Sequence, residues 1–375
     1  MNNPFVVKNY ESKERFCDRE EELELMMRNC LNHSDMTMIS QRRIGKTGLI
    51  FRLFDEISEK HRDIQTLYVD IFASRNIGDF IKLFTEAAML SFQPKTSIGE
   101  RLMHYIKSFR PQITYDNLTG QPQLQIAYQT AHEKEYTLRG LFEFLDSHGT
   151  PIVVAIDEFQ QIREYPEQNM EALLRTYIQP CKNLTFIFCG SRKHIMTDIF
   201  ANERKPFYSS TSFVALGKIP TESYSMFIRR LFEKGGRKVN DEAIAFILEW
   251  TQRVTYYTQQ LCHTIYANGD KTIGLPEVKE ACNQLLKQGE TVFLQYRQML
   301  TDKQWNFLVA VAKEGSVRQI TATEFLKKHQ IGGASTSRKM SESLFEKGLL
   351  NAETDLNGTE YAVGDVFFSH WLERL

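Results

Sequence analysis

The stretch MTMISQRRIGKTG, Met36–Gly48, decides the fold expected of this chain. It opens with a short apolar run, Thr37–Ser40, of the kind that forms a buried parallel strand. Gly45-Lys46-Thr47 follows, and apolar residues then recur at helical spacing from Leu49 to Ile57. Strand, tight loop, Gly-Lys-Thr and helix is the order that a phosphate-binding loop requires. The segment therefore predicts a site for nucleotide phosphates.

Each residue type in this loop has a chemical reason. Glycine at position 45 lets the backbone approach an anion without a Cβ in the way. Amide groups at a helix start favour negative charge. Lys46 would reach the β- and γ-phosphates, and the Thr47 hydroxyl would bind Mg²⁺. The full pattern begins with glycine where this chain has Ser40. A helix that merely begins with Gly-Lys-Thr is therefore the alternative, and a second motif has to decide.

The second motif is PIVVAIDEF, Pro151–Phe159. Its five consecutive apolar residues predict a strand buried on both faces. The strand ends in Asp157 and Glu158, and in open α/β sheets ligands bind outside the carboxyl ends of the strands. Asp157 would hold Mg²⁺ through water, and Glu158 would orient and activate the attacking water. Two acids that merely begin a solvated loop are the alternative, which the upstream phosphate loop disfavours.

The pattern around these motifs predicts an α/β fold with a doubly wound parallel sheet. Further strands are expected at Thr66–Phe72, Leu184–Cys189 and Thr211–Leu216. Gly190-Ser191-Arg192 follows one of them, so a polar side chain there would face the same crevice and sense the γ-phosphate. Helices are predicted at Phe80–Phe92 and Tyr136–Ser147, and a first helix is expected to have Asp18 as its N-cap.

Three domains follow from this reading. The ATPase domain spans residues 1–219 and includes an inserted hairpin at about 94–136, with strands Ile113–Tyr115 and Gln123–Tyr128 around Asn117–Gly120. A helical lid covers 220–289 and ends with a helix Leu275–Gly289. Residues 290–375 predict a winged helix, because three short helices precede a hairpin. Thr321–Glu324 is expected to cap the middle one. The expected helices of the last two domains are Glu222–Lys234, Asp241–Gln252, Tyr256–Asn268, Asp302–Glu314, Thr323–His329 and Thr336–Lys347.

Composition excludes several classes of protein. The 375 residues carry a net charge of −1, so the whole chain has no strong attraction to nucleic acid or anionic membranes. Its six cysteines form no C-x-x-C pair, which disfavours a zinc site. Cysteines scattered through a large chain are typical of reduced thiols. No apolar stretch is long enough to span a membrane, and the N-terminus has no signal-peptide pattern. We therefore expect a soluble, cytoplasmic protein.

With both phosphate motifs placed, the chain resembles the archaeal-type ATPases, close to the STAND branch of the AAA+ class of P-loop NTPases. The similarity covers almost the whole chain. The residues that carry it are Phe16–Glu20, Gln41–Thr47, Ile156–Gln160, Gly190-Ser191, Pro206–Tyr208 and Asp365–Leu372.

The resemblance implies a nucleotide domain, a helical lid and a C-terminal winged helix. It implies that Phe16 and Arg19 lie near the adenine, and that Ser191 or Arg192 is the first sensor. Arg204 would be a trans-acting arginine if copies of the chain assemble into rings or filaments, or else an ordinary surface arginine. In the lid, Arg253 would be a second sensor or a solvated helix-end arginine. The expected ATP-binding residues are Phe16, Arg19, Gln41, Arg42, Arg43, Ile44, Gly45, Lys46, Thr47 and Gly48, with Thr47 and Asp157 for Mg²⁺.

The winged helix does not by itself indicate DNA. Residues 287–375 contain equal numbers of basic and acidic residues. A local patch is expected from Arg338 and Lys339 on one helix and Lys327 and Lys328 on its neighbour, with Ser335, Thr336 and Ser337 as further phosphate contacts. Winged helices also bind proteins. The leading hypothesis is an ATP-dependent molecular switch with slow hydrolysis. An ATP-modulated DNA-binding regulator is the alternative.

Overall fold

The computed structural model describes residues 3–8, 10–92, 97–107, 112–115, 122–125, 130–355 and 358–375. The chain divides into two compact units. One comprises Lys8–Lys218, and the other comprises Ile219–Leu375 together with the N-terminal residues Met1–Val7. The expected division into three domains at 219 and 289 stays a prediction.

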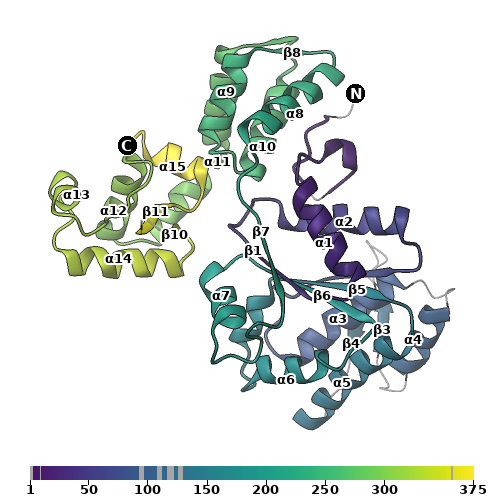
Figure 1. Ribbon diagram of the computed structural model, residues 1–375. Helices are drawn as coiled ribbons and strands as arrows, with labels where there is room; N and C mark the ends of the chain where they lie inside the picture. Colours follow the sequence, from purple (N-terminus) through teal and green to yellow (C-terminus); the bar gives the residue numbers. More distant parts are fainter. Residues whose placement is uncertain are drawn as a thin grey trace. The chain divides into compact units, whose positions relative to one another are not determined.

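The first unit is built on a five-stranded sheet in the order β2-β5-β6-β1-β7 (Figure 1). Every neighbouring pair in it is parallel, which confirms the predicted α/β class. β6 lies between β1 and β5, so the two phosphate motifs leave the sheet from strands that are not neighbours. The strands are β1 (Met36–Ile39), β2 (Gln65–Asp70), β5 (Ile152–Asp157), β6 (Leu184–Gly190) and β7 (Ser212–Ala215).

Both faces of this sheet are covered. Along β5, Val154 and Ile156 belong to one apolar core, whereas Val153 and Ala155 belong to the other. This alternation follows from the two-residue period of a strand. α1 (Glu20–Leu31) and α2 (Lys46–Lys60) supply the second core. The first core is supplied by α3 (Ile77–Ser91), α4 (Ser97–Lys107), α5 (Ala131–Ser147), the 3-10 helix η2 (Phe159–Glu164), α6 (Met170–Ile178) and α7 (Lys193–Ala201).

The predicted inserted hairpin is present as β3 (Gln112–Tyr115) and β4 (Pro122–Gln125), which pair antiparallel. Its expected turn, 117–120, lies outside the described residues. α4 was not predicted. The expected cap of α1 was wrong: Arg19, not Asp18, is the N-cap, and no side chain caps the helix. Both residues have positive φ, so the chain turns too sharply there for the Asp18 side chain to serve.

The second unit begins with a helical part and ends with a winged helix. α8 (Thr221–Lys234), α9 (Asp241–Trp250), α10 (Thr255–Asn268) and α11 (Leu275–Gln298) form the first, with a short parallel pair β8 (Lys238–Val239) and β9 (Thr272–Ile273). α12 (Asp302–Lys313), α13 (Thr323–Lys328), α14 (Ala334–Glu346), the hairpin β10 (Leu350–Asp355) and β11 (Gly358–Val363), and α15 (Val366–Leu372) form the second. The expected cap at Thr321–Glu324 was wrong, because Ala322 occupies the N-cap position of α13.

The predicted end of α11 at Gly289 was also wrong, since the helix continues to Gln298. Gly289 lies inside the helix, where the Phe293 ring packs on its backbone. A Cβ at position 289 would approach Phe293 Cζ to 2.5 Å. This glycine therefore permits close packing and does not terminate the helix.

α15 joins the helical part to the winged helix. Its Phe368 is fully buried against Phe293 of α11, with ring centroids 5.2 Å apart. The His370 ring stacks on Trp250 of α9 at 4.6 Å, and its Nε2 lies 2.8 Å from the Trp250 carbonyl oxygen. These contacts and the continuous α11 hold the two parts of the second unit together. Among the described residues, no helix is long and apolar enough to cross a membrane.

Candidate nucleotide-binding site

The loop between β1 and α2 has a left-handed turn at the glycine that its sequence places there. Gly45 is the N-cap of α2 and has φ of 104°, a left-handed conformation that glycine adopts without steric cost. Arg43 also has positive φ, at 68°. Ser40, which stands where the usual pattern has glycine, is buried, and its Oγ donates to the Gln41 carbonyl at 3.3 Å. The serine therefore fits the loop without disturbing it.

Lys46 folds back over this loop. Its Nζ lies 3.2 Å from the Gln41 carbonyl oxygen and 3.4 Å from that of Ser40, and only 7% of the residue is exposed. Burial lowers the pKa of Lys46, while the charges of Asp157 and Glu158 oppose that change. Two backbone carbonyl groups thus hold the Lys46 ammonium group at the loop. A bound anion could take their place as its hydrogen-bond partner.

Asp157, at the end of β5, accepts three hydrogen bonds. Thr47 Oγ1 donates to its Oδ2 at 2.8 Å, and the Tyr68 hydroxyl donates to the same oxygen at 2.9 Å. The Glu158 amide donates to Oδ1 at 2.9 Å. The structure therefore brings together the two residues predicted to hold Mg²⁺. Tyr68 of β2 was not predicted.

Glu158 turns away from the strand in a left-handed conformation, with φ of 55°. Its Oε2 accepts a hydrogen bond from Ser191 Oγ at 2.8 Å and another from Gln160 Nε2. Ser191 follows β6, which lies next to β5, so the sheet order explains why the two side chains meet. Gln160 is the second member of the site that sequence reasoning missed.

Of the two residues predicted as first sensor, only Ser191 joins this cluster. Arg192 is half exposed and pairs with Glu164, at 3.0 Å between Nη1 and Oε1. Its catalytic assignment is not supported by this geometry, because the guanidinium is engaged on the surface of η2.

The N-terminal segment reaches the loop through Phe16. A Cβ added at Gly48 would lie 3.3 Å from Phe16 Cε2, so the ring packs directly against the start of α2. Arg19 is buried and donates to Glu22 Oε1 at 2.8 Å and to the Gly217 carbonyl at 2.6 Å. The remaining predicted loop residues divide by burial: Ile44 lies in the core, Gln41 is half-buried, and Arg42 and Arg43 are exposed.

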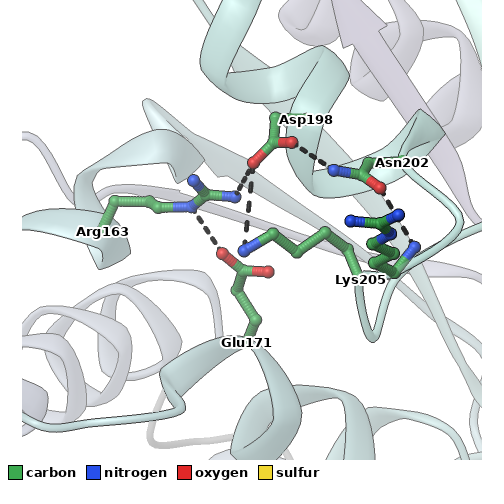
Figure 2. Close-up of polar contacts among 6 residues, drawn as sticks. Arg163, Glu171, Asp198, Asn202 and Lys205 are labelled. Carbon is green, nitrogen blue, oxygen red and sulfur yellow. Dashed lines mark hydrogen bonds and ion pairs between the residues drawn. The ribbon is translucent and has the colours of Figure 1, made fainter.

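An ion-pair network fixes η2, the segment that follows Glu158 (Figure 2). Arg163 contacts Glu171 of α6 at 2.5 Å and Asp198 of α7 at 2.7 Å. Asn202 donates to Asp198 at 2.6 Å, and its own oxygen accepts from the Arg204 amide at 3.0 Å. The hydrogen bond from Asn202, followed by that from Arg163, lowers the pKa of Asp198. The network holds the backbone at Arg204, whose side chain is exposed.

Arg253, the predicted second sensor, has positive φ and donates to the Ile219 carbonyl within its own unit at 3.3 Å. In the winged helix, Lys328 pairs with Glu314 at 2.6 Å, whereas Lys327, Arg338 and Lys339 are exposed. Ser337 was wrongly expected to reach phosphates, because it is buried and donates to the Ile320 carbonyl at 2.6 Å.

The residues present fit Mg-ATP. Within the described ranges, no group of three or more His, Cys, Asp or Glu side chains could hold a metal ion by itself. Thr47 and Asp157 offer two oxygens at one place, and Mg²⁺ commonly combines one or two protein oxygens with substrate phosphates and water. Gly45 and Lys46 supply the anion-binding elements beside them.

Comparisons with known proteins support the fold. Residues 291–374 match the family described as a probable winged helix domain. The Walker-type ATPase PABY2304 of Pyrococcus abyssi has a TM-score of 0.67 at 18% identity, with 99% of this chain and 100% of that chain covered. The ORC2 protein of Aeropyrum pernix, in ADPNP-ADP complexes, has a TM-score of 0.58 at 13% identity, covering 99% and 96%.

The ORC1 protein of Aeropyrum pernix, solved in complex with DNA, has a TM-score of 0.53 at 10% identity and covers 96% of this chain and 93% of its own. No curated protein matches the chain. These structural neighbours bear out the expected fold. The chain shares the fold of these structures, in which a parallel five-stranded sheet with helices is followed by a C-terminal winged helix.

Proposed function

We propose that this protein is a Mg-ATP-binding switch that hydrolyses ATP slowly. The single observation that carries the proposal is the meeting of two motifs from distant parts of the sequence. Thr47 of the loop contacts Asp157, and Glu158 lies beside it with Ser191 as its partner. A phosphate-binding element, a metal-binding pair and a carboxylate able to activate water are the parts that ATP hydrolysis needs.

Each side chain has a distinct task in this proposal. The Lys46 ammonium neutralises the phosphate oxygens. Thr47 and Asp157 would hold Mg²⁺, which would supply further positive charge to these oxygens when bound. Glu158 accepts a proton from the attacking water, and the Ser191 hydroxyl, 2.8 Å from Glu158, marks the position of the γ-phosphate. Phe16, packed against Gly48, bounds the place for the base.

The output is assigned to the second unit. Because α11 is continuous and α15 packs on both α9 and α11, we expect the helical part and the winged helix to respond to nucleotide as one body. Mg-ATP binding would order the helical lid and reposition the winged helix, and hydrolysis would reset both. The soluble, cytoplasmic location and assembly of several copies remain predictions.

Two variants test the proposal. Lys46→Ala should abolish binding of a fluorescent ATP analogue, since the loop then presents no cation to the phosphates. Glu158→Gln should bind ATP normally and lose hydrolysis by roughly a hundredfold or more. Arg192→Ala is the matched control, because the Arg192 guanidinium pairs with Glu164 on the surface of η2. Undiminished ATP binding by Lys46→Ala would refute the assignment of the site.

DNA binding by the winged helix is the second candidate function. Exposed Lys327, Arg338 and Lys339 favour it. The hairpin β10–β11 opposes it, since Leu350–Val363 contains three acidic residues and no Lys or Arg. Binding to duplex DNA should then be weak and decline with salt. Replacement of Arg338 and Lys339 by Ala should remove it, and binding that survives this change would exclude α14 as the contact.

A further inference from the structure

We infer that Gln160 is a positioning residue for Glu158, and that Gly190 is required for it to act. The inference rests on the proposed ATPase function and deepens it. Gln160 lies in η2, two residues after Glu158, and its Nε2 donates to Glu158 Oε2. Only 4% of Gln160 is exposed, so its amide can serve few partners other than this carboxylate.

The local backbone explains how the two side chains meet. Glu158 has a left-handed conformation, and η2 begins directly after it. The chain therefore reverses within two residues and brings the Gln160 amide back towards the carboxylate. Ser191 donates to the same oxygen from the neighbouring strand end. Both donors meet Oε2, and no described residue donates to Oε1, which is left to receive a proton.

The two ends of the Gln160 side-chain amide differ in their hydrogen bonding: the nitrogen has a partner, and the oxygen has none among the described residues. Its Oε1 is buried and has no hydrogen-bond partner among the described residues. A buried oxygen without a hydrogen-bond partner is destabilising. A purely structural glutamine at this place would satisfy both ends of its amide. The geometry instead directs the amide nitrogen at Glu158, and the amide oxygen has no partner among the described residues.

Gly190, the last residue of β6, makes room for this arrangement. A Cβ at that position would lie 2.3 Å from Gln160 Oε1 and 2.5 Å from Met196 Sδ. The φ of Gly190 is not positive, so the glycine is needed for space and not for backbone freedom. The end of β6 therefore supports the site in two ways: Ser191 donates to Glu158, and Gly190 admits Gln160.

Fixing one carboxylate oxygen with two donors orients the other oxygen towards the water. Small misplacements of a catalytic group have large effects on rate. Loss of the Gln160 donor should therefore lower turnover and leave ATP affinity intact, because no hydrogen bond among the described residues joins the Gln160 side chain to the loop or to Thr47 and Asp157.

The test compares Gln160→Leu with Gln161→Leu. Gln161 lies on the same 3-10 helix, but its Nε2 donates to the Ser74 carbonyl at 3.1 Å and not to Glu158. For Gln160→Leu we expect kcat to fall roughly tenfold to a hundredfold with KM and the Kd for an ATP analogue unchanged. For Gln161→Leu we expect a kcat within about twofold of wild type. Circular dichroism and thermal unfolding verify that both variants are folded.

Gly190→Ala supplies a second arm that leaves the Gln160 side chain chemically intact. It should reproduce the loss of kcat, because the added Cβ would lie 2.3 Å from Gln160 Oε1 and so displace the amide. An unchanged or raised kcat in Gln160→Leu would overturn the inference, as would an equal fall in Gln161→Leu. If instead wild-type protein neither binds nor hydrolyses ATP, the proposed function itself fails.

Discussion

Removal of one hydroxyl, in Tyr68→Phe, tests how the Asp157 carboxylate, which we propose binds Mg²⁺, is held. The Tyr68 hydroxyl donates to Asp157 Oδ2 at 2.9 Å, and its ring packs on Phe51 with centroids 4.8 Å apart. Phenylalanine keeps the packing and removes one of three hydrogen bonds to the carboxylate. A hydrogen bond to a charged group contributes about 1.5–3 kcal/mol.

The expected effect divides between stability and metal binding. We expect the free energy of unfolding to fall by about 1–2 kcal/mol. Loss of a partner that orients a metal ligand lowers metal affinity about tenfold to a hundredfold. Burial, followed by the negative charge of Asp157, raises the pKa of Tyr68, so the hydroxyl stays protonated and the effect should not vary from pH 6 to pH 9.

The assay is the Mg²⁺ dependence of ATP hydrolysis, with thermal unfolding in parallel. Tyr165→Phe is the matched control, because its hydroxyl bonds to Ser74 Oγ, away from Asp157. Wild type and Tyr165→Phe should reach half-maximal activity at the same Mg²⁺ concentration, and Tyr68→Phe should need about tenfold more. An unchanged Mg²⁺ dependence in Tyr68→Phe, together with reduced stability, would refute the reasoning.

Three further changes test the packing and the charge of the fold. Burial raises the pKa of Asp35 to about 6, so the folded state binds a proton at this carboxyl group more tightly than the unfolded chain does. The free energy of unfolding of the wild type therefore falls as pH rises from about 4 to 6. Asp35→Asn should therefore gain up to about 3 kcal/mol over wild type above pH 6 and none near pH 4 in urea unfolding, while the exposed Asp63→Asn should show no such change. Phe368→Ala removes a fully buried ring that packs on Phe293 of α11 and Trp305 of α12, and it should cost about 3–5 kcal/mol by the same measurement. Gly289→Ala would ordinarily stabilise a helix by about 1 kcal/mol, but here the new Cβ meets the Phe293 ring, so the melting temperature should fall; a rise would show that the ring can move aside.

The sequence predicted the elements that have strong local patterns. The apolar run of β5 and the Gly-Lys-Thr loop were sufficient to place Asp157, Glu158 and Thr47 at one edge of a parallel sheet. The contact between Thr47 and Asp157 then follows from the order of the strands. Ser191 was predicted for the same reason, since it follows a buried strand.

What the sequence could not predict depends on contacts between distant residues. Tyr68 resembles any apolar strand residue until β2 is known to pair with β5, where Asp70 lies opposite Asp157. The contact between Gln160 and Glu158 depends on the left-handed conformation of Glu158, and no residue type in the sequence indicates that conformation. Gly289 looked like a helix end because the ring that packs on it, Phe293, was not assigned to the same helix.

The long helix α11 has a mechanical consequence. Its 24 residues extend for about 36 Å at 1.5 Å per residue. Both ends are clamped, the first by α9 and α10 and the second by α15. A rigid rod of that length magnifies small rotations: a tilt of about 10° at its first turn carries its last turn about 6 Å. A change of about 1 Å across the first turn of the rod would thus displace its last turn, where the winged helix begins, by about 6 Å.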